Sequence, residues 1–227
     1  MSTSPDKLKV EVLPDDYAQY NISFKMIVIG DAGVGKSCLT KKAAKGYFEE
    51  VYSATVGFEY LIFNVKINDK IIKLQIWDTC GQELYRSLVK GFYRNSSIVA
   101  MVYAINNKES FRHINSWLKE VKLQSNPDVK VILIGNKSDL EEERLVQINE
   151  AQRFTEEHNI HFFCETSAKN GINTQEVFVE AAKMLYNDHL MFKEKNSNKL
   201  EKVNNIPIPI KVHNKNDVKR KKEGCCG

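Results

Sequence analysis

Residues 24–38 read FKMIVIGDAGVGKSC, and this stretch decides the fold of the chain. A run of apolar residues is followed at residues 30–37 by the spacing G-x-x-x-x-G-K-S, the pattern of a phosphate-binding loop between a strand and a helix. Gly33 and Gly35 allow the backbone to turn its N–H groups inward around a polyphosphate. The helix that follows adds the partial positive charge of its N-terminus. The alternative is an ordinary glycine-rich turn.

The side chains of this loop extend the interpretation from backbone to ligand. We expect the Lys36 ammonium to reach the β- and γ-phosphates as a point charge. The Ser37 hydroxyl is an oxygen donor of the kind that Mg²⁺ prefers. The residues predicted to contact the phosphates are therefore Ala32, Gly33, Val34, Gly35, Lys36, Ser37 and Cys38.

Length, charge and cysteine content limit the class of protein. With 227 residues and 42% hydrophobic residues, the chain can form one sizeable core with a remainder. The net charge is +4, but residues 195–227 alone carry +6, so the rest is slightly acidic. This distribution argues against a nucleic-acid face and for a charged tail. We expect no membrane span, no signal peptide and no disulfide framework, and hence a reduced, cytosolic protein.

Hydrophobic patterns predict alternating strands and helices. The expected strands are 24–29, 60–67, 71–77, 98–103, 129–134 and 162–165, with a hairpin between the second and third; the expected helices are 38–45, 110–123, 146–158 and 174 to about 192. We therefore expect an α/β fold of the P-loop NTPase class. It would be a single domain with a six-stranded, mostly parallel sheet covered by helices on both faces, plus a disordered C-terminal tail. The boundaries are 1–21 for a flexible N-terminal extension, 22–193 for the domain and 194–227 for the tail.

Two loops after the later strands predict which base is bound. Gly135-Asn136-Lys137-Ser138-Asp139 follows one strand and Thr166-Ser167-Ala168-Lys169 follows the next. The Asp139 carboxylate would accept two hydrogen bonds from guanine, whereas adenine would leave it unpaired. Lys137 would cover the purine face, and Asn136 would tie the neighbouring loops together. We expect the nucleotide-contacting residues here to be Asn136, Lys137, Asp139, Ser167, Ala168 and Lys169; the alternative is a pair of polar turns.

The segment Trp77-Asp78-Thr79-Cys80-Gly81-Gln82-Glu83 predicts a hydrolytic centre. Asp78 ends an apolar strand at the position that holds Mg²⁺ through water. The Gly81 N–H can approach the γ-phosphate closely, and Gln82 is suited to orienting an attacking water, which makes it our catalytic candidate. Thr55 can add its hydroxyl to the Mg²⁺ shell. The metal ligands are thus predicted to be Ser37, Thr55 and Asp78, with GTP or GDP as the bound nucleotide.

From Phe24 to about residue 192 the chain resembles small GTPases of the Ras superfamily, and more narrowly those of the Rab family. The resemblance rests on the motifs above and on the stretches TVGFEY (55–60), KLQIWDT (73–79), FYR (92–94) and the CCG end. It implies a G domain in which Phe48 stacks on guanine, Thr55 lies in switch I and residues 81–91 form switch II. It also implies that effectors read Tyr60, Trp77 and Phe92, although Trp77 is equally well explained as a core aromatic.

The sequence departs from the Rab pattern at a few positions that hold no required ligand. Cys80 stands where most Rab proteins have alanine; we expect a space-filling role, with a redox-sensitive thiol as the alternative. Leu84-Tyr85 and Asn95-Ser96 also differ, and they leave effector identity open.

The C-terminal end resembles Rab tails. Cys225 and Cys226 would carry two geranylgeranyl groups, and the basic run 219–222 would add attraction to an anionic leaflet. The implied partners are an exchange factor, a TBC-type activating protein, a GDP-dissociation inhibitor, the Rab escort protein with its geranylgeranyl transferase, and effectors. We expect a monomer on the cytosolic face of endomembranes, with the compartment undetermined. The alternatives are a GTP-binding scaffold that does not cycle and a Ras- or Rho-like signalling GTPase.

Overall fold

The computed structural model describes residues 8–49, 57–80 and 91–204, and side chains up to residue 195. The strands are β1 (Val10–Leu13), β2 (Ile22–Ile29), β3 (Phe58–Ile67), β4 (Lys70–Thr79), β5 (Ile98–Ala104), β6 (Lys130–Asn136) and β7 (Phe162–Glu165). The helices are α1 (Lys36–Lys45), α3 (Lys108–Gln124), the short 3₁₀ turn η2 (Glu141–Glu143), α4 (Ile148–Glu157) and α5 (Glu176–Asn204). None of the helices in these ranges is long and apolar enough to cross a membrane.

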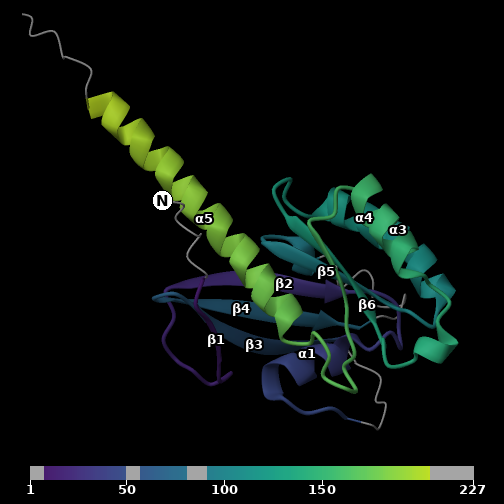
Figure 1. Cartoon of the computed structure of the whole chain (residues 1–227). Coiled ribbons are helices and arrows are strands. Elements are labelled where there is room, and N and C mark those ends of the chain that lie inside the picture. Colours follow the sequence, from purple (N-terminus) through teal and green to yellow (C-terminus); the bar gives the residue numbers. More distant parts are fainter. Residues whose placement is uncertain (1–7, 50–56, 81–90, 205–227) are drawn as a thin grey trace, which may run out of the picture. The chain divides into compact units, whose positions relative to one another are not determined.

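The seven strands form one sheet in the order β1-β3-β4-β2-β5-β6-β7 (Figure 1). Strands β4, β2, β5, β6 and β7 are parallel, and β3 runs antiparallel to both of its neighbours. Chain order reverses at β2, because β3 and β4 lie on one side of it and β5 on the other. In open α/β sheets, ligands bind at the carboxyl ends of the strands beside such a reversal.

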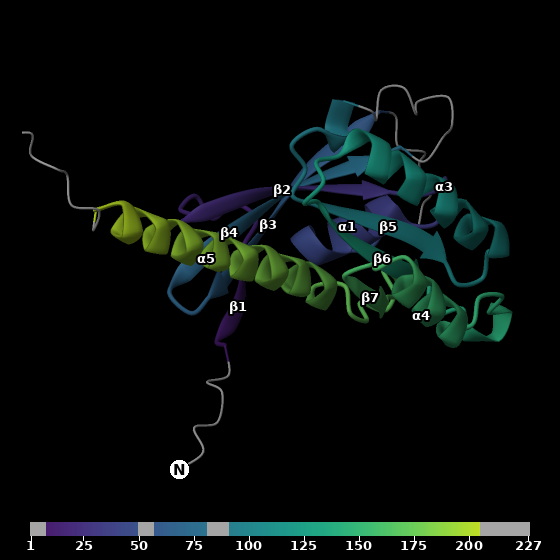
Figure 2. The same cartoon turned by 90° about the horizontal axis from the view of Figure 1, so that it is seen from above.

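The centre of the sheet is buried on both faces, as the side chains of β2 show. Met26 and Val28 belong to the core that contains Leu39 of α1 and Phe178 of α5, whereas Ile27 and Ile29 belong to the core packed by α3 and α4. A strand covered on both sides reads as a continuous apolar run, and that is how β2 reads. Figure 2 shows the sheet from above, with α3 beside β5 and α4 beside β7. The predicted α/β class, with helices on both faces, is confirmed.

Strand β1 corrects the expected six-stranded sheet and the expected flexible extension of residues 1–21. It pairs with β3 in the register Val10↔Ile67 to Leu13↔Asn64. The buried Asn64 side chain donates from Nδ2 to the carbonyl oxygen of Pro14 at 2.8 Å, so the turn after β1 is fixed as well. Residues 10–21 are therefore part of the folded domain because their backbone groups find partners on β3 and β4.

Helix α5 also differs from its predicted length, because it continues to Asn204 rather than ending at about Phe192. Lys, Glu and Leu, which favour helices, are frequent over residues 193–202, and Pro207 is the first residue that cannot continue a helix. Residues 190–204 form a separate unit from the domain that ends at His189. The remainder of the predicted tail, residues 205–227, lies outside the described ranges.

Candidate nucleotide site

The phosphate loop joins the carboxyl end of β2 to the first turn of α1. Gly33 and Gly35 have φ angles of 77° and 90°, in the left-handed region that favours glycine. Gly30 is required for a different reason, since a Cβ on it would lie 2.1 Å from the carbonyl oxygen of Val102 on β5. Helix α1 starts at Lys36 with Gly35 as its N-cap and no side-chain cap, so its first N–H groups are available to a ligand.

Lys36 is buried inside this loop. Its Nζ donates to the carbonyl oxygens of Gly30 and Asp31, at 2.9 and 2.8 Å. Burial lowers the pKa of Lys36, and the nearby carboxylates of Asp78 and Asp31 oppose that effect. The cation is thus held at the centre of the loop by carbonyl oxygens, which a phosphate can replace as a stronger partner.

Ser37 and Asp78 meet at the carboxyl ends of β2 and β4. The Ser37 hydroxyl donates to Asp78 Oδ2, while Asp78 Oδ1 is buried and has no hydrogen-bond partner. Burial raises the pKa of Asp78 to about 6, since little water reaches the carboxylate. An unpartnered carboxylate oxygen beside a serine hydroxyl fits the hard-oxygen chemistry of Mg²⁺. In the described ranges no group of three or more His, Cys, Asp or Glu side chains forms a metal site. The ion would take its remaining ligands from the predicted Thr55, which lies outside the described residues, and from phosphate and water oxygens.

Asn136 joins three loops, as its position predicts. Its Nδ2 donates to the carbonyl oxygens of Val34 and Gly35 in the phosphate loop, at 2.9 and 3.3 Å. Its Oδ1 accepts from Thr166 Oγ1 at 3.0 Å and from Ala168 N at 3.4 Å, in the loop after β7. Asn136 is itself buried, so one side chain sets the spacing between the phosphate loop and the two loops predicted to hold the base.

The predicted base-binding residues lie together at the ends of β6 and β7. Ser167 Oγ donates to Asp139 Oδ1 at 2.5 Å, and the Ser138 N–H donates to the carbonyl oxygen of Thr166 at 3.0 Å. Lys137 has a φ of 66°, and its Cε lies 3.9 Å from the position that a Cβ on Gly35 would take. These contacts orient the Asp139 carboxylate and bring the Lys137 stem over the phosphate loop.

Other predicted residues are placed less directly. Phe48 is half-buried after α1 and packs against the core on the α1 side. Cys80 is buried, which agrees with a space-filling role, although Lys36 lies close enough to interact with it electrostatically. Lys169 is exposed at the end of the loop after β7. The predicted Thr55, Gly81, Gln82, Cys225 and Cys226 lie outside the described residues.

Three aromatic residues predicted to face effectors form one cluster on the surface beside β3 and β4. The ring centroid of Trp77 lies 5.2 Å from that of Tyr60 and 5.1 Å from that of Phe92. Phe58, which the sequence analysis missed, joins them at 5.2 Å from Trp77 and 4.7 Å from Phe92. Phe58 is 49% and Tyr60 44% exposed, whereas Trp77 is half-buried and also packs on the core. The alternation of side chains along β3 could have indicated Phe58, because residues 58 and 60 lie on the same face of the strand.

Two further polar contacts support the site and were not expected. Arg144, whose side chain is 7% exposed, donates from both Nη atoms to the Glu165 carboxylate at 2.7 and 2.8 Å. Glu165 directly precedes the loop that contains Ser167, so this bidentate pair fixes the start of that loop. Asp31 in the phosphate loop contacts α3 through its side chain. The only sequence signal for the Asp31 contact was a charged residue inside a glycine-rich loop. The sequence around Arg144 and Glu165 carried no signal for their pairing.

One comparison with known proteins matches most of this domain. The model of the Ras family matches residues 25–187, which extend from β2 into α5 and contain every loop of the site described above.

Proposed function

The chain belongs to the Ras family of small GTPases, and from this premise we propose that it is a Rab-type switch in membrane trafficking. Ras-family proteins bind GTP and GDP with Mg²⁺, hydrolyse GTP, and act through regulators and effectors. The observation that carries the nucleotide-binding part of the proposal is the Asn136 junction, which joins a phosphate loop to a carboxylate-bearing loop suited to guanine.

Guanine selection rests on Asp139. A carboxylate here accepts from the N1–H and the 2-amino group of guanine, and adenine offers neither donor. The Ser167 hydroxyl, which donates to Asp139 Oδ1, fixes the edge of the carboxylate that is presented. A site built in this way discriminates by about 10⁴-fold or more, because the wrong base leaves a polar group unpaired.

The phosphate end is arranged for charge stabilisation. Lys36 gives up two carbonyl partners to bind phosphate oxygens, and Ser37 and Asp78 would hold Mg²⁺. The bound ion supplies neutralisation of the charge that develops on the β- and γ-phosphates. We propose that Gln82 orients the attacking water, and none of the contacts described at the phosphate loop comes from an arginine side chain. We therefore expect intrinsic turnover on the order of 10⁻⁴–10⁻³ s⁻¹ and a need for an activating protein of the TBC type.

Rab-type function is supported by the aromatic surface and the tail. Tyr60, Trp77 and Phe92 form a contiguous cluster in which Tyr60 is exposed and the other two are half-buried, and effectors would read it in the GTP state. Cys225 and Cys226 fit double geranylgeranylation by a transferase acting with the escort protein. A GDP-dissociation inhibitor would then extract the lipidated protein from membranes. We propose that the protein cycles between cytosol and the cytosolic face of an endomembrane, and that an exchange factor reloads it there.

The enzymatic part is tested by single-turnover hydrolysis of radiolabelled GTP by purified protein. We expect wild type to cleave GTP slowly and Gln82→Leu to lower that rate at least tenfold, since the water loses its orienting group. Gln124→Leu, an exposed change at the end of α3, is the matched control and should behave as wild type. Equal rates for wild type and Gln82→Leu, with and without an activator, would favour a scaffold that binds GTP without cycling.

The Rab assignment is tested separately on Cys225 and Cys226. Mass spectrometry of protein from cells should find two geranylgeranyl groups on Cys225 and Cys226, and a tagged copy should label internal membranes. Changing both cysteines to serine should release the protein to the cytosol. A single farnesyl group, with plasma-membrane labelling, would replace this assignment with a Ras- or Rho-like one.

A further inference from the structure

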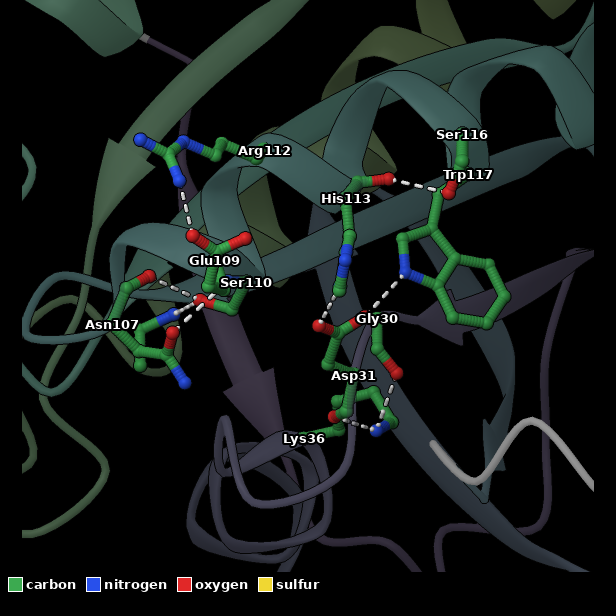
Figure 3. A network of polar contacts seen from close by, with 11 residues as sticks. Gly30, Asp31, Lys36, Asn107, Glu109, Ser110, Arg112, His113, Ser116 and Trp117 are labelled. Carbon is green, nitrogen blue, oxygen red and sulfur yellow. Dashed lines mark hydrogen bonds and ion pairs between the residues drawn. The ribbon is translucent and has the colours of Figure 1, made fainter.

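Asp31 lies in the phosphate loop, although its carboxylate has the same sign of charge as the expected ligand. The structure turns this side chain out of the loop and onto α3 (Figure 3). Asp31 Oδ1 accepts from Trp117 Nε1 at 2.9 Å, and Asp31 Oδ2 lies 2.6 Å from His113 Nδ1. The two partners are one turn apart on the same face of the helix, as side chains at i and i+4 must be.

Helix α3 is a rigid support for this contact. Asn107 caps its N-terminus by accepting from the Ser110 N–H at 3.0 Å, and Ser110 Oγ accepts from the N–H of Ala104 at the end of β5 at 3.1 Å. The buried face of the helix, Trp117 included, packs into the core on that side of the sheet. The position of His113 and Trp117 is therefore set by the fold and does not depend on the loop.

The contact also reaches the lysine of the loop. The main-chain oxygen of Asp31 accepts from Lys36 Nζ at 2.8 Å, so the residue held by α3 also positions the cation that binds phosphate. If α3 released the carboxylate, Asp31 could turn towards the ligand and repel it. The Asp31 side chain is only 22% exposed. Repulsion between like charges is stronger where water is partly excluded.

We propose that His113 and Trp117 are positioning residues that hold the Asp31 carboxylate away from the phosphates and thereby slow nucleotide release. This proposal rests on the proposed nucleotide site. It assigns to one face of α3 a role in retention of the nucleotide that neither the phosphate loop nor the base loops supply. Guanine selection and the cleavage of bound GTP do not depend on it.

The test measures release of a fluorescent GDP from the full chain loaded with Mg²⁺. His113 is 47% exposed in its side chain, so His113→Ala should fold and should speed release about threefold. Combining it with Trp117→Phe, which keeps an aromatic ring but removes the N–H donor, should speed release about tenfold or more. Arg112→Ala is the matched control, because Arg112 points to Glu109 on the same helix and away from the loop (Figure 3).

The decisive step adds Asp31→Asn to the double variant. A neutral amide does not repel phosphate, so release should slow again by at least threefold; a purely structural role predicts no such rescue. Single-turnover cleavage of bound GTP should remain at the wild-type rate in the His113→Ala variant and in its combination with Trp117→Phe. Wild-type release from His113→Ala, or no rescue by Asp31→Asn, would overturn the proposal. Failure of wild type to bind GDP at all would instead overturn the proposed function.

Discussion

At the scale of single residues, Asn136 connects the loops of this site. It is buried and contacts the phosphate loop with one end of its amide and the loop after β7 with the other. A hydrogen bond that is lost in a buried site leaves its partner without water or protein to replace it. The spacing between the phosphate and base subsites therefore depends on one short side chain.

We predict that Asn136→Ala speeds release of GDP by about 100-fold. Leaving buried partners unsatisfied costs about 1–3 kcal/mol for each group, and at least two groups are affected. Stopped-flow release of a fluorescent GDP measures the effect. Asn115→Ala, an exposed change on α3, should leave release unchanged. A change of less than fivefold for Asn136→Ala would show that the loops keep their spacing without it.

Cys164 on β7 gives a prediction about pH. Burial raises the pKa of this thiol to about 11, with the charges of Glu176 and Glu165 adding to the shift. Because the thiolate is the reactive form, a raised pKa lowers reactivity at neutral pH. At pH 8 we expect iodoacetamide to modify Cys164 about 100-fold more slowly than a free cysteine.

The rate should also rise about tenfold for each pH unit between 7 and 10, as long as the thiolate remains a small fraction. Mass spectrometry of the peptide that contains Cys164 follows the reaction. The same peptide from the urea-unfolded chain should level off near pH 9. A plateau below pH 9 in the folded protein would contradict the raised pKa.

At the scale of elements, β1 extends the sheet by one strand beyond β3. It pairs with β3 at the end of the sheet opposite to the nucleotide site, and Asn64 fixes the turn that follows it. Further along, Asn21 exchanges two hydrogen bonds of 2.8 Å with the backbone of Ile71. The N-terminal residues therefore stabilise the sheet without touching the site.

We predict that deleting residues 1–17 lowers the unfolding midpoint by about 5–10 °C and leaves GDP release unchanged. The deletion removes the pairing of β1 and exposes the Asn64 amide, a loss of roughly 2–3 kcal/mol. Differential scanning fluorimetry gives the midpoint. Deleting residues 1–7 is the control, since it stops short of β1. Equal midpoints for the two deletions would mean that β1 adds nothing to stability.

At the scale of the whole molecule, those parts of the domain could be predicted whose sequence pattern lies within one short stretch of the chain. The run before Gly30 identifies a strand covered on both faces, and glycine spacing identifies the loop after it. Strand β1 escaped prediction because VEVL is short and its partner lies more than fifty residues away. The Asp31 contact with α3 and the Arg144–Glu165 pair escaped for the same reason: each joins residues that only the fold brings together.

Strand β1 also sets a limit on what else can join this sheet. It covers β3 only at Asn64–Ile67, so the outer edge of β3 from Phe58 to Phe63 is not covered by β1. An extended peptide that added itself there would meet the end of β1 after about six residues. The edge therefore admits a short added strand and excludes a long one. In this way β1 limits the length of strand that a partner, or a second copy of the chain, could add to the sheet.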